Sequence, residues 1–194
     1  MTATLHSSGT TAAVIVTHQR AELLRLSLDQ VVNQTHPVDW VIVVDNGAED
    51  AVRDSLDELA GERAVYVPSE TNLGGAGGFA LGFLTALSLG ADAIWCADDD
   101  GRPADHSVLE TLYRVAEDHH LAEVSPAVCN IDDPQRLAFP LRQGLVWRRR
   151  LDELEGDFLP GIASLFNGAL ISAKAMEVIG VPDYRLFILS LIHI

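Results

Sequence analysis

Three consecutive aspartates, Asp98, Asp99 and Asp100, are the residues of this chain best suited to chemistry. They follow an apolar run, "DAIWCA", and precede a glycine and a proline. In extended or turning backbone, side chains i and i+2 point to the same side, so Asp98 and Asp100 can act together. Two carboxylates on one side suit Mg²⁺ or Mn²⁺, and such an ion relieves their repulsion. The alternative is a solvated strand end whose acids cap the next helix.

A glycine-rich stretch, "NLGGAGGFALG" at residues 72–82, is the second candidate. Three interpretations stay open. The glycines before the helix can bring backbone N–H groups close to an anion at its N-terminus. Residues 75–80 also fit the dinucleotide fingerprint GxGxxA, although the stretch follows the third predicted strand, after an intervening "PSETNL". Finally, the small residues Gly78, Ala80, Gly82 and Ala86 can let a helix pack closely on a sheet.

These residues must be positioned by alternating strands and helices. Apolar runs predict strands at 12–17, 40–45, 63–67 and 92–98, with helices predicted at 20–34, 48–61, 77–90 and 104–118. Continuously apolar strands indicate a mostly parallel α/β sheet flanked by helices, in which ligands bind beyond the carboxyl ends of the strands. The residues that follow these strands are Thr17, Arg20, Asp45, Asn72 and the three aspartates.

The later part of the chain is less regular. We expect a fifth strand near 121–130, a hairpin turning at Gln143-Gly144, a strand over 161–172 and a helix over 173–180. One domain is predicted over 12–187, after a disordered lead at 1–11 and before a tail at 188–194 that we interpret as non-native.

The composition limits the class of protein. The net charge of −15 argues against a nucleic-acid partner and means that an anionic ligand needs a metal, a helix N-terminus or placed arginines. The two cysteines show no zinc-site spacing, and the N-terminus lacks the pattern of a signal peptide, so a cytoplasmic protein is expected.

The combination "VIVTHQR…VIVVDNG…NLGGAGGFALG…WCADDDGRP" resembles the inverting glycosyltransferases of family 2, with their GT-A (Rossmann-like) fold and DxD motif. With "FNGALIS" it is most similar to the galactofuranosyltransferases of mycolic-acid bacteria and related actinobacteria, which begin the cell-wall galactan. Rhamnosyltransferases are near neighbours. The resemblance implies Mn²⁺ or Mg²⁺, a UDP-sugar donor, a polyprenyl-diphosphate-linked glycan acceptor and peripheral contact with the inner face of the plasma membrane.

The resemblance also implies residue roles. Asp98 and Asp100 fit the DxD motif and hold ribose and metal, with Asp99 as a further metal ligand. On the donor side, the resemblance places Thr17 and Arg20 at the nucleotide and diphosphate, and Asp45 at uracil or ribose. It places Asn72, Gly74 and Gly75 against the nucleotide-sugar. Asn167 and Gly168 are implied to lie at the donor sugar or acceptor.

The family's catalytic base comes from a later acidic motif, whereas Asp183 is the last acid of this chain. We therefore expect the base to lie beyond Phe187, and we expect this chain to bind UDP-sugar and metal but to turn over poorly. Two alternatives remain: a non-catalytic sugar-nucleotide-binding fragment, and a nucleotidyltransferase. The latter usually has glycines and a nearby lysine after its first strand, where this chain has "THQR".

Overall fold

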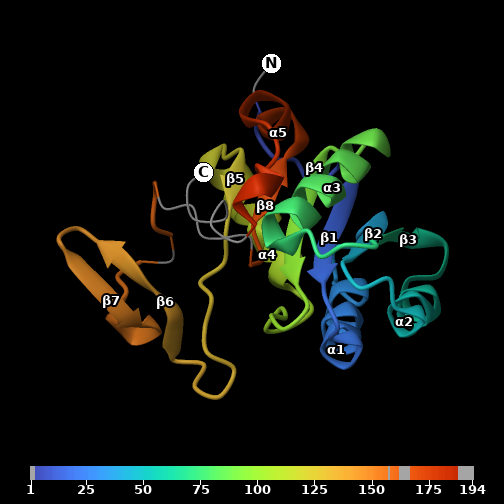
Figure 1. Ribbon diagram of the computed structural model, residues 1–194. Coiled ribbons are helices and arrows are strands. Elements are labelled where there is room, and N and C mark those ends of the chain that lie inside the picture. Colours follow the sequence, from blue (N-terminus) through green and yellow to red (C-terminus); the bar gives the residue numbers. More distant parts are fainter. Residues whose placement is uncertain (1–2, 157, 162–166, 188–194) are drawn as a thin grey trace.

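A computed structural model of the chain describes residues 3–156, 158–161 and 167–187 (Figure 1). The elements, in chain order, are β1 (Thr11–Thr17), α1 (Ala21–Val32), β2 (Trp40–Asp45), α2 (Asp50–Ala60), η1 (Gly61–Arg63), β3 (Ala64–Pro68), α3 (Gly74–Ser88), β4 (Ala93–Asp98), α4 (Val108–His119), β5 (Glu123–Val124), β6 (Arg136–Gln143), β7 (Val146–Arg150), η2 (Leu151–Glu153), β8 (Leu170–Ser172), α5 (Ala173–Ile179) and η3 (Tyr184–Leu186).

The main sheet has six strands in the order β3-β2-β1-β4-β8-β5. The four strands β3, β2, β1 and β4 are parallel, whereas β8 runs antiparallel to both β4 and β5. The strand order reverses between β1 and β4, because β2 and β3 lie on one side of β1 and the later strands lie on the other. The predicted α/β class with a mostly parallel sheet is confirmed.

Helices cover both faces of this sheet (Figure 1). On one face α1, α2 and α4 pack through residues such as Leu28, Leu56 and Leu109. On the other face α3 and α5 pack through Phe83 and Met176. Strand residues alternate between the two cores, so both faces need apolar side chains, which explains the continuously apolar strands.

The predicted boundaries need several corrections. Helix α3 begins at Gly74, three residues before the predicted start, and α4 begins at Val108 rather than near 104. The fifth strand is only Glu123–Val124. The strand expected over 161–172 is present at Leu170–Ser172, and residues 162–166 lie outside the described part of the chain.

The N-terminal segment also differs from its prediction. Among the described residues before β1, Leu5 is buried and its N–H donates to the Leu121 carbonyl at 2.8 Å. Ser7 donates from its N–H and its hydroxyl to Glu117. This segment is packed on the domain rather than disordered, because Leu5 adds an apolar side chain to the core beside α4. The predicted tail at 188–194 lies outside the described residues.

A second sheet consists of the two antiparallel strands β6 and β7, which form the hairpin predicted at Gln143-Gly144. It stands apart from the main sheet in Figure 1. No helix in the described part of the chain has the length and apolar composition required to cross a bilayer.

Candidate functional site

The carboxyl ends of three neighbouring strands bring the candidate residues to one edge of the sheet. In the strand registers, Thr17 of β1 lies beside Asp45 of β2, and Val16 of β1 lies beside Asp98 of β4. Ligands of doubly wound sheets bind where the strand order reverses, which is here the gap between β1 and β4. The structure thus places the residues after β1 and the residues after β4 at the expected edge.

Asp98, Asp99 and Asp100 form what we call the acidic turn. One carboxylate oxygen from each residue can be chosen such that all three lie within 4.8 Å of one another. Asp98 is partly buried, Asp99 is buried and Asp100 is exposed. Burial, followed by the charges of Asp100 and Asp99, raises the pKa of Asp98 to about 6. The turn therefore concentrates more negative charge than its surroundings neutralise.

Arg20, just after β1, is the cation that meets this turn. Its Nη1 atom lies 3.2 Å from Asp99 Oδ1 and 2.8 Å from Asp100 Oδ2. Attraction to Asp99, and then to Asp100, raises the pKa of Arg20. The Thr17 hydroxyl donates to Asp99 Oδ2 at 3.0 Å. Asp99 is thus held by Thr17 and Arg20, Asp100 is paired with Arg20, and Asp98 accepts a hydrogen bond from the Asp99 N–H.

Ser27 of α1 supports the acidic turn from the core side. Its side chain is buried, and its hydroxyl is within hydrogen-bond distance of two backbone carbonyl oxygens, Asp98 O at 2.8 Å and Gly101 O at 3.1 Å. These contacts link both ends of the turn, at Asp98 and Gly101, to α1. Ser27 is not among the residues predicted for the site, although a serine on the apolar face of α1 was a usable signal.

Asp45 lies at the same edge but is fully buried. Its carboxylate accepts hydrogen bonds from the N–H groups of Gly47 and Glu49, at 2.8 and 2.7 Å, and from the Tyr66 hydroxyl at 2.9 Å. Burial and the bond to Asp45 raise the pKa of Tyr66 to about 12. In this structure Asp45 organises the turn between β2 and α2, and its contact with uracil or ribose stays a prediction.

The glycine-rich stretch forms the start of α3. The Asn72 side-chain oxygen accepts from the Gly74 N–H at 2.8 Å, and Gly74 has φ +67°. The buried Asn46 side chain joins this start to the end of β2, because it accepts from the Leu73 N–H and donates to the Gly74 carbonyl, both at 3.3 Å. Asn46 is a second residue that the sequence analysis did not single out.

Farther along α3, close packing explains the glycines. A Cβ atom on Gly78 would lie 2.4 Å from Val16 Cγ1, and one on Gly82 would lie 2.3 Å from Val14 Cγ1. Side chains at these positions would push α3 off β1. This confirms the packing interpretation for Gly78 and Gly82, and it makes a dinucleotide fingerprint unnecessary to explain them.

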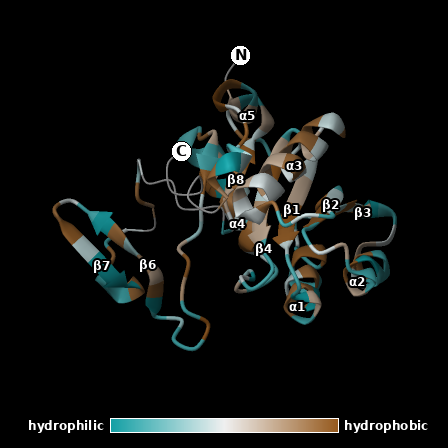
Figure 2. Cartoon of the chain, viewed as in Figure 1, coloured by the Kyte–Doolittle hydropathy of each residue, from teal (hydrophilic) through white to brown (hydrophobic). Residues whose placement is uncertain are grey.

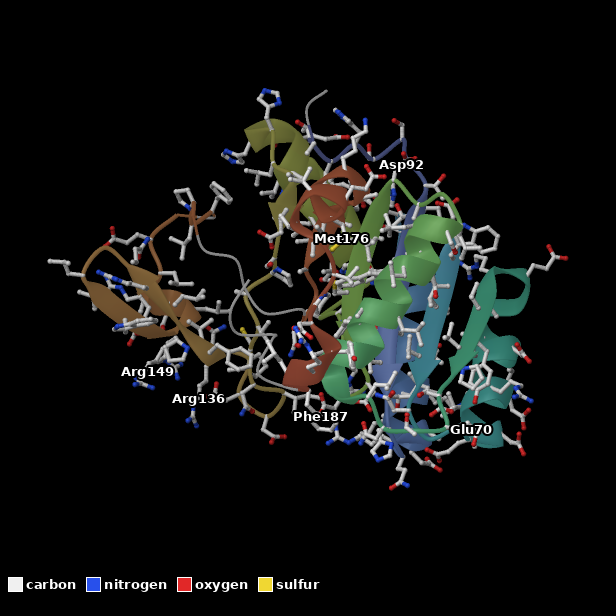
Figure 3. The ribbon with its side chains drawn as sticks, turned by 45° about the horizontal axis from the view of Figure 1, so that its top comes forward. Glu70, Asp92, Arg136, Arg149, Met176 and Phe187 are labelled. Atoms are coloured by element: carbon white, nitrogen blue, oxygen red, sulfur yellow. The ribbon has the colours of Figure 1, made fainter. Side chains whose placement is uncertain are left out.

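Phe187 covers part of the α3 N-terminus. Its carbonyl accepts from the Ala76 N–H at 2.7 Å, and its ring lies 2.6 Å from where a Cβ atom on Gly74 would be. Figure 3 shows Phe187 at the same end of the sheet as Glu70, opposite Asp92. One of the first N–H groups of α3 is thus already bonded within the chain, so Gly75 and Asn72 are more open to a ligand than Gly74.

Asn167 and Gly168 lie beside β4. The Gly168 N–H donates to the Cys96 carbonyl, and the Cys96 N–H donates to the Ala169 carbonyl. Gly168 and Ala169 thus oppose one residue of β4, which is a β-bulge, and Gly168 has φ +87°. The glycine is required by this bulge, which brings Asn167 toward the carboxyl end of β4.

A separate apolar cavity of about 680 Å³ lies along α4 and β5. Its walls include Leu112, Val115 and Leu121 from the domain, and Leu141 and Leu154 from the region of the second sheet. It does not include the acidic turn, Arg20 or the start of α3. This cavity is thus distinct from the charged edge of the sheet.

Comparison with known proteins decides the family. The model of the family described as "Glycosyl transferase family 2" matches residues 12–171, which is most of the chain. The chain belongs to glycosyl transferase family 2. The acidic turn accordingly fits the DxD motif, with Asp98 and Asp100 at its two acidic positions.

Curated relatives in this family include galactofuranosyltransferases GlfT1. The chain is 61% identical to GlfT1 of Mycolicibacterium smegmatis, over 91% of this chain and 60% of that protein. It is 58% identical to GlfT1 of Mycobacterium tuberculosis, over the same shares of the two chains. The chain thus spans about 60% of the length of the curated relatives that it matches.

Solved structures with a similar fold include a mannosyltransferase, and also a 4-diphosphocytidyl-2C-methyl-D-erythritol synthase of Anaerococcus prevotii (TM-score 0.56, 14% identity, 92% of this chain and 75% of that chain). Staphylococcus aureus TarS (residues 1–349, in complex with UDP) matches with a TM-score of 0.70 at 12% identity, over 94% of this chain and 52% of that chain. The mannosyltransferase PcManGT of Pyrobaculum calidifontis, in complex with GDP-Man and Mn²⁺, matches with a TM-score of 0.61 at 18% identity, over 92% and 49%. These likenesses establish the GT-A fold.

The acidic turn fits a divalent cation in its chemistry. Carboxylate oxygens are the hard ligands that Mg²⁺ and Mn²⁺ prefer, and three of them converge here from adjacent residues. Burial, and then repulsion from Asp100 and Asp99, raises the pKa of Asp98, and the nearby Arg20 offsets only part of the repulsion. A bound cation would remove it.

Proposed function

We propose that the chain is the donor-binding domain of an inverting galactofuranosyltransferase. It would act on a UDP-sugar and a polyprenyl-diphosphate-linked cell-wall glycan, in the cytoplasm at the inner face of the membrane. The observation that carries the proposal is the acidic turn at the β1/β4 edge, in a chain 61% identical to a galactofuranosyltransferase. The neighbour TarS has been crystallised with UDP, which supports a uridine nucleotide as the ligand.

Asp98 and Asp100 are proposed to hold Mn²⁺ or Mg²⁺, with Asp99 as a further ligand. When bound, such an ion stabilises the negative charge of a departing nucleoside diphosphate. Arg20 carries a fixed positive charge at the same turn and can donate hydrogen bonds to diphosphate oxygens. Because the protein is acidic overall, these local positive charges are what would let it bind an anionic donor.

The remaining donor contacts follow from the edge geometry. Thr17 keeps Asp99 oriented and is proposed to border the nucleotide. Asp45 would reach uracil or ribose only if it exchanged one of its present hydrogen bonds. Asn72, Gly74 and Gly75 at the start of α3 are proposed to lie against the nucleotide-sugar, although Gly74 is buried beneath Phe187 in this structure.

The acceptor side is proposed to lie across β4 from the nucleotide. Asn167 is brought toward the end of β4 by the bulge at Gly168, on the side of β4 opposite to β1. A donor sugar bound at the acidic turn would therefore lie between Arg20 and Asn167. This arrangement gives the acceptor hydroxyl an approach from the β8 side.

The catalytic base is proposed to lie beyond Phe187. Asp183 is the last acid of the chain, and its two oxygens bind Arg185, which lowers the pKa of Asp183 to about 2. A carboxylate with so low a pKa is a weak base toward a hydroxyl proton at neutral pH. Asp183 is therefore unsuited to activate an acceptor.

Donor selectivity tests the proposal. With Mn²⁺ present, we expect UDP-galactofuranose to raise the melting temperature of the chain more than UDP-galactopyranose or dTDP-rhamnose does. A larger shift with dTDP-rhamnose would favour a rhamnosyltransferase instead. A transfer assay on a synthetic polyprenyl-diphosphate glycan, using this chain, should show little product beside a full-length relative. Transfer at ordinary enzymatic rates would overturn the placement of the base beyond Phe187.

A further inference from the structure

The β6–β7 hairpin differs in charge from the rest of the protein. Residues 134–151 contain five arginines and no aspartate or glutamate. The rest of the chain has the other eight lysines and arginines against all 28 acidic residues, a formal charge of −20. The flanking residues Asp132, Asp133, Asp152, Glu153 and Glu155 are acidic, so the positive charge is confined to the strands and the turn of the hairpin.

The loop end of this hairpin is also apolar. Leu145 is 90% exposed, Trp147 is 61% exposed and Val146 is 50% exposed. Figure 2 shows the hydrophobic colour at the loop end of the hairpin, which extends away from the main sheet. Large apolar side chains grouped on a projecting turn mark an interaction surface rather than a part of the core.

Basic and aromatic side chains share one face of the hairpin. Arg142 pairs directly with Trp147 across the two strands. Arg149 lies two residues beyond Trp147, so it points to the same face. Arg136 pairs with Arg150, so it lies with Arg150 on the opposite face of the hairpin. Arginines beside a tryptophan are well suited to the boundary between phosphates and acyl chains.

The arginines differ in their existing partners. Arg148 lies 3.8 Å from Glu155, and Arg150 lies 3.5 Å from Asp133. Within the described part of the chain, Arg136, Arg142 and Arg149 have no carboxylate within the 4.0 Å of an ion pair. These three arginines are available to bind external anions.

We propose that the β6–β7 hairpin docks the protein onto an anionic phospholipid surface. The arginines bind lipid phosphates, while Leu145, Val146 and Trp147 enter the interfacial layer. A membrane interface offers negative charge and an apolar layer together, which matches both properties of this hairpin. The strongly negative remainder of the protein is repelled by the same surface, which favours an orientation with the hairpin toward it.

Vesicle binding tests the proposal directly. We expect the chain to co-sediment with vesicles of equal phosphatidylglycerol and phosphatidylcholine, but not with vesicles of pure phosphatidylcholine. The bound chain should dissociate at about 0.5–1 M salt, where the attraction between exposed charges is screened. The double substitution Arg142→Gln/Arg149→Gln should weaken binding about 25-fold, because each basic residue near such a surface contributes about fivefold. The matched control is Arg114→Gln, an exposed arginine on α4.

Fluorescence identifies the segment that inserts. Vesicle binding should shift the tryptophan emission to shorter wavelength, and Trp147→Phe should abolish most of that shift, since Trp95 is already buried and Trp40 is half-buried at the start of β2 in the main sheet. Unchanged UDP binding by the hairpin variants separates this proposal from the proposed function. The proposal is overturned if the chain ignores anionic vesicles, binds neutral ones equally, or binds anionic vesicles equally well after the double substitution. It is also overturned if the hairpin instead mediates dimers in sedimentation velocity.

Discussion

The acidic turn and the β6–β7 hairpin each gather like charges, but they hold them in different ways. The acidic turn is partly buried and is tied to α1 and β1 through Ser27, Thr17 and Arg20. The hairpin arginines are mostly exposed, and water screens them from one another. The buried cluster therefore needs structural support and a defined ligand, whereas the exposed cluster can meet a broad, non-specific surface.

Removing the charge of the acidic turn should have the largest effect. We expect Asp98→Asn and Asp100→Asn to lower the affinity for Mn²⁺-dependent UDP binding by at least about a hundredfold, since each removes a ligand. Asp98→Asn should also make the metal-free protein more stable, because it removes a buried charge whose pKa is raised. Calorimetry and thermal melting measure the two effects, with the exposed Asp54→Asn as control. If Asp98→Asn instead lowered the stability of the metal-free protein, the charge of Asp98 would not be destabilising, contrary to this prediction.

Removing Arg20 should have the next largest effect. We expect Arg20→Ala to weaken UDP binding about tenfold, by loss of charged hydrogen bonds to the diphosphate. Arg25→Ala is the matched control, because Arg25 is an exposed α1 residue paired with Glu58. If the two variants lost UDP affinity equally in the same titration, Arg20 would contribute only to the net charge of the protein and would make no specific contact with the diphosphate.

Acid should affect the two regions differently. The raised pKa of Asp98 means that the folded, metal-free protein binds a proton near pH 6, above the usual range of aspartate. Protons then compete with the cation, so metal affinity should fall about tenfold from pH 7 to pH 5. The stability of the metal-free protein should gain from the same protonation as the pH falls through 6. Vesicle binding by the arginines should not change over this range. If vesicle binding fell together with metal affinity, the acidic turn and the hairpin would not differ in their response to acid as proposed.

Removing the Ser27 hydroxyl should have a smaller effect, because Ser27 supports the geometry of the acidic turn rather than binding a ligand. We expect Ser27→Ala to weaken metal affinity about threefold and to lower the free energy of unfolding by about 1 kcal/mol. Tyr113→Phe is the control, because its hydroxyl contacts Thr11 at the opposite end of the sheet. It should lower stability without changing metal affinity. If both variants changed metal affinity equally, Ser27 would have no specific role at the turn.

The hairpin substitutions should have the smallest effect on the nucleotide site. We expect Arg142→Gln/Arg149→Gln to change UDP affinity by less than about twofold, because both arginines are exposed and salt screens exposed charges. Titration at 0.15 M salt checks this. A larger loss would mean that the two regions act on the same ligand.

Much of the fold could be predicted because its signal is local. The apolar strand runs and the acids that follow β2 and β4 are visible in the sequence, and the strand registers bring them together. The start of α3 was predicted too late, since a run of glycines is typical of a loop, whereas Gly74 begins the helix after the Asn72 contact.

The support of the site could not be predicted in the same way. Ser27 and Asn46 act through backbone groups 71 and 28 residues away in the chain, and spacing alone does not show such contacts. The cover that Phe187 places on α3 depends on the path of the C-terminal segment. Asp45 was identified correctly as an edge residue, but its buried hydrogen bonds to Gly47 and Tyr66 appear only in the structure.

The measurement that tests the central claim most directly is calorimetric titration of UDP into the chain. It should be made with Mn²⁺, then with excess EDTA, and alongside NADH. We predict UDP binding that requires Mn²⁺ and is lost in Asp98→Asn, with no binding of NADH. UDP binding that is indifferent to EDTA, or NADH binding in its place, would contradict the assignment of the acidic turn to a metal-held diphosphate.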